Sequence, residues 1–351
     1  MEKYDAFLLV SFGGPEKRED VLPFLENVLR GKNVPRERML AVAEHYYHFD
    51  GVSPINAQNR ALLAAVERDL RENGVDLPVY WGNRNWSPYF AETLSQMRDD
   101  GVRRAVAFFT SAYSSYSGCR QYRENLTAAR DEVGEGAPAV FKLRAFFNHP
   151  GFIEAMEARL TESVGQLRQT TPADVPVLFT AHSIPLSMAT GCRYEPQLQE
   201  TCRILAERLG LANWRLVYQS RSGPPTQPWL EPDILQALEQ VRASGAKEAI
   251  VCPVGFISDH MEVLYDLDCE AKDFCDAHGI AMVRTPTVGT HPRFVRMITE
   301  LVQERMAEAA ERPALGRFPA SHDVCPADCC LYTPARPPGV GASPAGQRPV
   351  G

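Results

Sequence analysis

The chain has 351 residues, of which 44% are hydrophobic and 23% charged, and a formal net charge of −7, which is typical of a globular protein of about two domains. It has no basic cluster and no apolar run of about 18 residues, which argues against a nucleic-acid partner and against a membrane span. Gly13, Gly14 and Pro15 interrupt the apolar N-terminal stretch, which favours a first strand over a signal peptide, and we expect a cytoplasmic protein.

Short apolar runs alternate with segments of helical periodicity along the chain, a pattern typical of parallel strands covered by helices. The predicted strands lie at residues 6–12, 79–84, 105–112, 176–183, 215–220, 248–256 and 281–286. The predicted helices include residues 59–73, 231–245 and the long amphipathic segment 148–169. We therefore expect an α/β fold of two similar doubly wound lobes with parallel sheets and a cleft between them.

The change from one lobe to the next is expected near residue 150, within the long helix that connects them. This gives an N-terminal lobe at 1–150, a C-terminal lobe at 151–318 and a cysteine-containing segment at 319–332. Residues 333–351 are rich in Pro, Gly, Ala and Arg and have little that a core could bury, so we predict a disordered tail.

A histidine and an acidic helix are the first candidate functional groups. His182 ends a predicted strand, at the edge where parallel sheets bind ligands, although a lone histidine is more often structural. Glu262, Asp266 and Glu270 follow another strand at i, i+4 and i+8, where each like-charged pair costs about 0.2–0.5 kcal/mol in an isolated helix. Either they form a solvated acidic face near a helix N-terminus, or with His182 opposite Glu262 they bind a divalent metal such as ferrous iron.

The chain has nine cysteines, which we expect to be reduced in the cytoplasm. Six of them are scattered singly: Cys119, Cys192, Cys202, Cys252, Cys269 and Cys275. Most of these six are expected to be small buried hydrophobic residues. Cys325, Cys329 and Cys330 crowd together in VCPADCC near the C-terminus. This crowding indicates a metal or cluster site.

Six motifs, in order, give the chain a resemblance to a known family. They are LLVSFGGP, DGVSPINAQ, AYSSYSGCRQY, LFTAHSIP, VYQSRSGPPTQPWLEPD and CPVGFISDHMEVLYDLDCEA. Over roughly residues 5 to 305 the sequence resembles ferrochelatases, and AYSSYSGCRQY is similar to the actinobacterial branch. The resemblance implies a lyase that inserts ferrous iron into a porphyrin in haem biosynthesis, with the chelatase fold and its active site between the lobes.

The resemblance also implies roles for the candidate residues. His182 matches the active-site histidine, which takes protons from the pyrrole nitrogens or binds the incoming iron, and Glu262 matches its acidic partner on the opposite wall. Asp266 and Glu270 match an acidic line that relays metal or protons. Which of His182 and Glu262 binds iron first stays open.

Four residues of the first half are candidate porphyrin contacts. Ser53 and Tyr122 fall in motifs that contact the porphyrin in the family, and Phe12 stands where a tyrosine can face the metal. The phenylalanine removes a possible axial oxygen. Arg30 is either a partner for a propionate or a solvated surface arginine.

Some ferrochelatases hold a 2Fe-2S cluster with one internal and three C-terminal cysteines, and Cys325, Cys329 and Cys330 resemble the C-terminal three. Four ligands are the usual requirement, and Ala155 stands at the internal position. The alternatives for the missing ligand are another cysteine or a non-cysteine residue such as His322, Asp323 or Asp328. A chain without a cluster, with an exposed thiol patch, is the remaining alternative.

Coproporphyrin III is the favoured substrate, because it is water-soluble and the sequence shows no membrane anchor. The alternatives are protoporphyrin IX, a chelatase for cobalt or nickel, and a non-enzymatic haem or porphyrin carrier. A dinucleotide-binding enzyme is disfavoured because the first strand leads into Ser-Phe-Gly-Gly-Pro and not into G-x-G-x-x-G. We expect a monomer.

Overall fold

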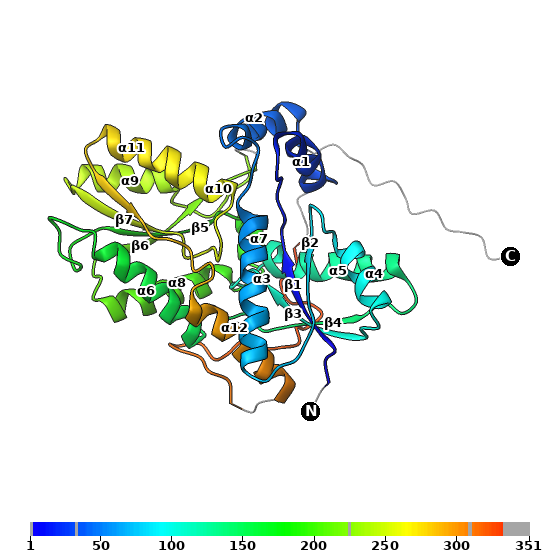
Figure 1. Ribbon diagram of the computed structural model, residues 1–351. Helices are drawn as coiled ribbons and strands as arrows, with labels where there is room; N and C mark the ends of the chain where they lie inside the picture. Colours follow the sequence, from blue (N-terminus) through cyan, green and yellow to red (C-terminus); the bar gives the residue numbers. More distant parts are fainter. Residues whose placement is uncertain (1–2, 32–33, 224–225, 308–310, 333–351) are drawn as a thin grey trace.

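The computed structural model describes residues 3–31, 34–223, 226–307 and 311–332 (Figure 1). The predicted tail at 333–351 lies outside the described residues. Among the residues described, no helix combines the length and the apolar character needed to cross a membrane.

Two four-stranded parallel sheets form the centre of the molecule, which confirms the predicted α/β fold. The first has the order β2-β1-β3-β4, with β1 at Ala6–Ser11, β2 at Val79–Asn83, β3 at Arg104–Phe109 and β4 at Ala139–Lys142. The second has the order β6-β5-β7-β8, with β5 at Val177–His182, β6 at Trp214–Gln219, β7 at Glu248–Cys252 and β8 at Ala281–Arg284. The sequence did not predict β4, a short, half-buried edge strand.

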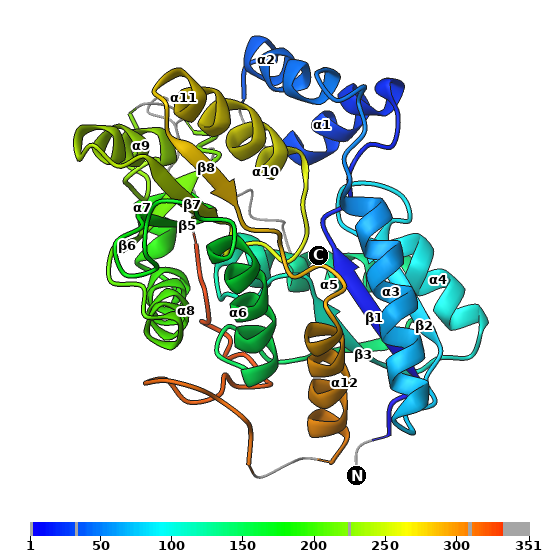
Figure 2. The same cartoon turned by 60° about the vertical axis from the view of Figure 1, so that its left-hand side comes forward.

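Helices cover both faces of each sheet (Figure 2). The α-helices are α1 (Val21–Leu29), α2 (Arg36–Tyr47), α3 (Ile55–Glu72), α4 (Phe90–Asp99), α5 (Gln121–Val133), α6 (Pro150–Val164), α7 (Leu186–Ala189), α8 (Tyr194–Leu209), α9 (Ile234–Ala243), α10 (Met261–Val263), α11 (Lys272–Ala277) and α12 (Pro292–Ala307). A 3₁₀ turn, η1 (Arg18–Asp20), and two π-helical segments, η2 (Tyr116–Arg120) and η3 (Leu264–Ala271), complete the set.

Local chemistry explains where several helices begin and end. The side chain of Asp233 accepts a hydrogen bond from the Leu235 amide at 2.9 Å, and the Asp233 amide donates one to the side-chain oxygen of Gln236 at 3.1 Å, so α9 begins with a capping box. Helix α8 ends at Gly210, whose φ of +64° favours glycine. In α3 the buried residues Leu62, Val66 and Leu70 recur at helical spacing and turn one face towards the core.

Alternate residues of the central strands enter different cores. In β1, Leu8 packs with α4 and α5, whereas Phe7 enters the largest core. In β5, Leu178 packs with α9 and η3, whereas Phe179 enters that same largest core. The inner faces of the two sheets therefore share one continuous apolar core, and each sheet has a second core on its outer face, as a doubly wound architecture requires.

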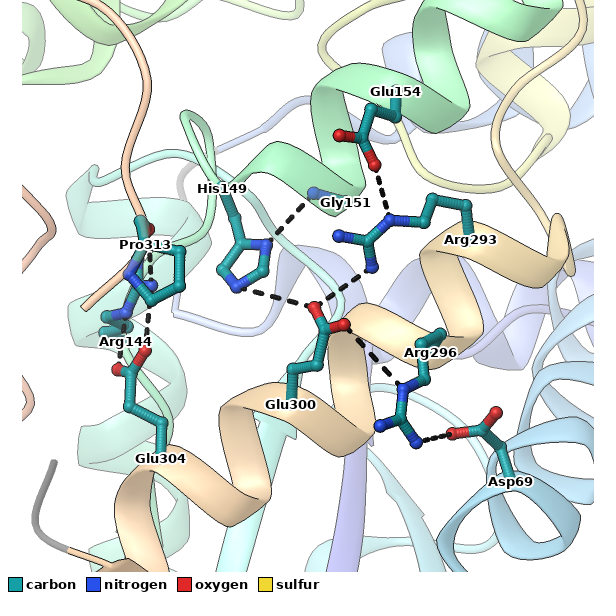
Figure 3. Close-up of polar contacts among 10 residues, drawn as sticks. All are labelled: Asp69, Arg144, His149, Gly151, Glu154, Arg293, Arg296, Glu300, Glu304 and Pro313. Carbon is teal, nitrogen blue, oxygen red and sulfur yellow. Dashed lines mark hydrogen bonds and ion pairs between the residues drawn. The ribbon is translucent and has the colours of Figure 1, made fainter. Parts of the chain in front are cut away.

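A network of charged side chains joins the two halves along α12 (Figure 3). Arg293 of α12 pairs with Glu154 of α6 and with Glu300, and Arg296 reaches Asp69 of α3 at 3.8 Å. Because α12 comes from the second half of the chain and also packs against α3, the predicted division near residue 150 stays a prediction.

Residues 311–332 pass along the outside of the molecule as an extended segment (Figure 2). The side chain of Asn148 donates a hydrogen bond to the carbonyl of Phe318 at 2.8 Å, and Phe318 packs against Phe147. The guanidinium of Arg120 donates to the carbonyls of Ala327 and Cys329 at 2.7 and 3.0 Å. The C-terminal segment is thus held against the π-helical turn η2.

Candidate active site

His182 stands at the carboxyl end of β5, as the sequence predicted. Gly255, in the turn after β7, lies so close to this strand that a Cβ there would be 2.6 Å from that of Ala181. The His182 Nδ1 atom lies 2.5 Å from the carbonyl oxygen of Ser183. Since a carbonyl oxygen only accepts, Nδ1 carries the hydrogen and Nε2 of the neutral ring keeps its lone pair.

Glu262 faces the free nitrogen of this histidine. Its carboxylate oxygen lies 3.5 Å from Nε2 of His182 and 4.0 Å from Nδ1 of His260. The structure therefore brings together the two residues that the sequence placed on opposite sides of one site. His260 was missed, although it lies two residues before Glu262 in the same motif.

The helix that carries the acidic residues differs from the expected regular α-helix. It begins as one turn of α10 and continues as the π-helix η3 before α11. Val263, Leu267 and Ala271 are buried at intervals of four residues. The carboxylates, one residue earlier at each repeat, share the neighbouring face, and Glu270 is exposed at its far end. π-Helical segments are rare and occur frequently at functional sites.

Asp266 is held by the end of strand β6. The amide nitrogen of Gln219 lies 3.2 Å from its Oδ2 atom, and the hydroxyl of Ser220 donates to the same oxygen. Thr180 of β5 fixes the Gln219 amide by donating to its oxygen at 2.8 Å. Ser220 has a φ of +62°, a left-handed conformation that only a few per cent of non-glycine residues adopt. Neither Gln219 nor Ser220 was predicted.

These contacts shift the protonation of the site. Burial, together with the negative charges of Glu262 and Glu270, raises the pKa of Asp266 to about 7, against the opposing hydrogen bond from Ser220. Burial opposes protonation of His182, but the charge and hydrogen bond of Glu262 outweigh it, so the pKa of His182 is raised. Partial desolvation by neighbouring atoms, together with the charge of Asp233, raises the pKa of Glu270 although its side chain is largely exposed. The site therefore combines an imidazole whose protonated form is favoured with a half-buried carboxyl group whose pKa lies near 7.

The predicted porphyrin contacts lie on the first lobe in different surroundings. Phe12 follows β1 and packs edge-to-face on Phe24 at 6.2 Å between ring centroids. Phe24 and Met261, the residue before Glu262, belong to one apolar cluster, and Phe12 packs against it, so Phe12 lies near the acidic helix. Ser53 is buried, and its amide donates to the carbonyl of Pro15 at 2.9 Å.

The other two predicted contacts differ in exposure. Tyr122 is buried in α5 between Phe90 and Phe109, with the guanidinium carbon of Arg84 5.7 Å from its ring centroid. Arg30 is exposed at the end of α1 and donates to the side-chain oxygen of Asn27 at 2.6 Å.

A thiol cluster lies where the C-terminal segment meets η2. The Sγ atoms of Cys329 and Cys330 are 3.6 Å apart, and Nε2 of His322 lies 3.8 Å from Cys329 Sγ. The thiol of Cys119, in η2, lowers the pKa of Cys325 to about 4 against the effect of burial. Cys119 is buried, as expected for most of the scattered cysteines. Cys119 is far from the C-terminal cysteines in the sequence, so no sequence motif connects it with them.

Comparison with known proteins agrees with this architecture. The family profile described as Ferrochelatase matches residues 4–306. A relative named Ferrochelatase from Rhodopirellula baltica is 62% identical, covering 97% of each chain. A relative named Coproporphyrin III ferrochelatase from Streptomyces coelicolor is 48% identical, covering 97% of this chain and 96% of the relative.

Among solved structures, one described as SirB from Bacillus subtilis with Fe3+ superimposes with a TM-score of 0.57. It covers 87% of this chain and 97% of that chain at 10% sequence identity. The likeness therefore supports the two-lobed fold alone.

Proposed function

The chain belongs to the ferrochelatase family of porphyrin metal chelatases, and from this premise we propose that its substrates are ferrous iron and coproporphyrin III. The relative from Streptomyces coelicolor carries that substrate in its name, whereas the relative from Rhodopirellula baltica does not distinguish between porphyrins. Coproporphyrin III has four propionates and is water-soluble, so it need not be taken from a membrane. The proposal further places the enzyme in the cytoplasm and takes it to act as a monomer.

The pairing of His182 with Glu262 is the observation that carries the proposal. Metallation releases two protons from the pyrrole nitrogens as the cation enters the ring. Nε2 of His182 has its lone pair available, because Nδ1 donates to the Ser183 carbonyl. Glu262, 3.5 Å away, stabilises the imidazolium that forms when Nε2 accepts a proton.

Asp266 and Glu270 are proposed to extend the site into an acidic line that carries protons or metal and leads away from the porphyrin ring. With a pKa of about 7, Asp266 exists in both protonation states near neutral pH, so it passes protons outward from His182 and Glu262. Its carboxylate form, with Glu262 and the exposed Glu270, also offers the hard oxygen ligands that an incoming divalent cation needs.

The porphyrin is proposed to lie against the first lobe, with Phe12 near the metal and Ser53 and Tyr122 along its contact surface. Phe12 offers an aromatic face and no axial oxygen. Arg30 is exposed and its guanidinium matches the geometry of a propionate.

We also propose that Cys325, Cys329 and Cys330 help to hold a 2Fe-2S cluster. The donor set fits: two of the sulfurs lie 3.6 Å apart, close to the separation of about 3.8 Å expected for two thiolates on one tetrahedral metal with bonds of about 2.3 Å. When bound, the cluster would supply iron–thiolate bonds that tie the C-terminal segment to the body of the protein.

The test is an anaerobic assay of the purified protein with ferrous iron, in which the absorbance of coproporphyrin III and of protoporphyrin IX is followed in parallel. Faster turnover of coproporphyrin III supports the proposal. Faster turnover of protoporphyrin IX would instead assign protoporphyrin IX as the substrate. Tight porphyrin binding without metal insertion would favour a porphyrin or haem carrier.

A further inference from the structure

A histidine from the first half of the chain and a cysteine from the second half meet beside the acidic helix. The Nε2 atom of His48, which directly follows α2, lies 3.7 Å from the Sγ atom of Cys269 in η3. His48 is exposed and Cys269 is half-buried, so dissolved ions can reach both donor atoms. The proposed mechanism of iron insertion uses neither residue.

Neighbouring aromatic rings orient the imidazole of His48. It packs edge-to-face on Phe49 at 4.9 Å and on Tyr265 at 6.3 Å between ring centroids. Tyr265 in turn stacks on His45 of α2, with the centroids 3.7 Å apart and the ring planes 8° from parallel. These contacts hold the end of α2 against η3, on the side where Nε2 of His48 meets the sulfur.

Two further contacts fix the distance between the same elements. The amide of Asp259 donates a hydrogen bond to the side-chain oxygen of Gln58 in α3 at 2.9 Å. Met261 of α10 is buried in an apolar cluster that α1 and α2 supply. Both contacts lie on the segment that leads into η3. The pairing of His48 with Cys269 is therefore set by packing between two elements and not by the rotation of two free surface side chains.

The separation of the two donor atoms matches a shared metal ion. Bonds of about 2.3 Å to sulfur and about 2.1 Å to nitrogen at a tetrahedral zinc ion place the two donors about 3.6 Å apart. A thiol is only a weak hydrogen-bond donor, so a direct contact between Cys269 and His48 contributes little to stability. Thiolate and imidazole are ligands that suit Zn²⁺, which such sites bind more tightly than Fe²⁺.

The charges around the sulfur favour a cation. Desolvation and the negative charges of Asp273, Asp268 and Glu270 raise the pKa of Cys269. A thiol that coordinates a metal ion loses its proton, and the charge of a divalent ion then offsets these carboxylates. The surroundings that oppose a free thiolate are therefore compatible with a metal-bound one.

We propose that His48 and Cys269 bind a thiophilic divalent cation of the Zn²⁺ type, which ties α2 to η3. Water completes the coordination shell beyond these two side chains, so the ion exchanges with the solvent. Because η3 also carries Asp266 and follows directly on Glu262, the ion restrains the helix of the candidate active site. It is distinct from the ferrous iron that the enzyme inserts, and its binding does not depend on which porphyrin is the substrate.

The experiment measures the alkylation rate of Cys269 in chelator-treated, full-length protein with and without Zn²⁺, by mass spectrometry of its peptide. Each cysteine is followed separately, so the other thiols do not interfere. We expect Zn²⁺ to protect Cys269 in wild type and in His278→Ala, which removes another exposed histidine, but not in His48→Ala. Equal rates with and without Zn²⁺ in wild type would overturn the site. Protection that persists in His48→Ala would overturn the bridge between the two residues.

Two further measurements examine the same ion. Co²⁺, as a spectroscopic substitute for Zn²⁺, should give wild type a stronger thiolate-to-cobalt charge-transfer band than Cys269→Ser, by one equivalent of bound metal; identical bands would contradict the assignment. Zn²⁺ should also slow hydrogen exchange in α2 of wild type but not of Cys269→Ser, and unchanged exchange with the ion bound would exclude the tie between α2 and η3. Because none of these measurements uses iron insertion, their failure is distinct from failure of the proposed activity.

Discussion

Replacing Asp266 by asparagine should stabilise the folded protein at alkaline pH. The folded-state pKa is about 7, compared with 3.8 for an ordinary aspartate. Between these values the native state holds a proton that the unfolded state has released. The raised pKa of Asp266 therefore stabilises the folded wild-type protein fully below about pH 4. This contribution to the free energy of unfolding is lost as the pH rises to 7.

The size of the effect follows from the same values. A difference of about three pKa units corresponds to about 4 kcal/mol at 1.36 kcal/mol per unit. Between pH 5 and pH 8 the wild type should lose about 2–3 kcal/mol of this, whereas Asp266→Asn has no carboxyl group to ionise. Asparagine retains an oxygen that accepts the hydrogen bonds from Ser220 and Gln219.

Urea unfolding at pH 5, 6, 7 and 8 would measure the free energy of unfolding of both proteins. Asp273→Asn, which removes an exposed carboxylate from the next helix, is the control for the change in net charge. We expect the difference between Asp266→Asn and wild type to grow with pH, and that for Asp273→Asn to stay nearly constant. A difference for Asp266→Asn that is independent of pH would refute the reasoning.

Three further substitutions test the site and the fold. His182→Ala should lower kcat by about 10²–10⁴-fold, the usual contribution of a general base, while fluorescence titration shows porphyrin affinity nearly unchanged; normal turnover would remove the central role of His182. Glu262→Gln should lower the pKa of His182 and thus move the acidic limb of the kcat profile to lower pH, with little change in melting temperature; an unmoved limb would contradict the pairing. Arg144→Met should destabilise the protein by about 3–5 kcal/mol in urea unfolding, because it leaves the buried Glu304 without its closest cation; a change below about 1 kcal/mol would show that Arg312 replaces it.

Strand positions could be predicted because the central strands are buried on both faces and appear as continuous apolar runs. Strand β4 escaped prediction because it lies at a sheet edge and is only half-buried. His182 was predictable as a candidate since a strand end fixes its location in a parallel sheet. Its neighbours were not all predictable, because Gln219 and Ser220 reach Asp266 only through the pairing of β6 with β5.

Two other features depend on contacts that spacing does not encode. A spacing of four residues predicts a shared helical face but does not distinguish an α-helix from the π-helix η3. The C-terminal cysteines come near η2 only when the C-terminal segment returns to the turn after β3, where Arg120 donates to the carbonyls of Ala327 and Cys329. A contact between segments so far apart in the chain leaves no local pattern in the sequence.

The acidic face of η3 shows why local energetics and function have to be considered together. From the sequence, its repulsion amounts to a few tenths of a kcal/mol per pair. In the fold the cost of ionising Asp266 is larger, because burial adds to the repulsion from Glu262 and Glu270. Together they raise the pKa of Asp266 to about 7. A surface helix could avoid this by exchanging one carboxylate for a neutral residue. Local conflicts of this kind are expected at functional sites, and here it keeps a carboxyl group that changes protonation near neutral pH beside the His182 and Glu262 pair.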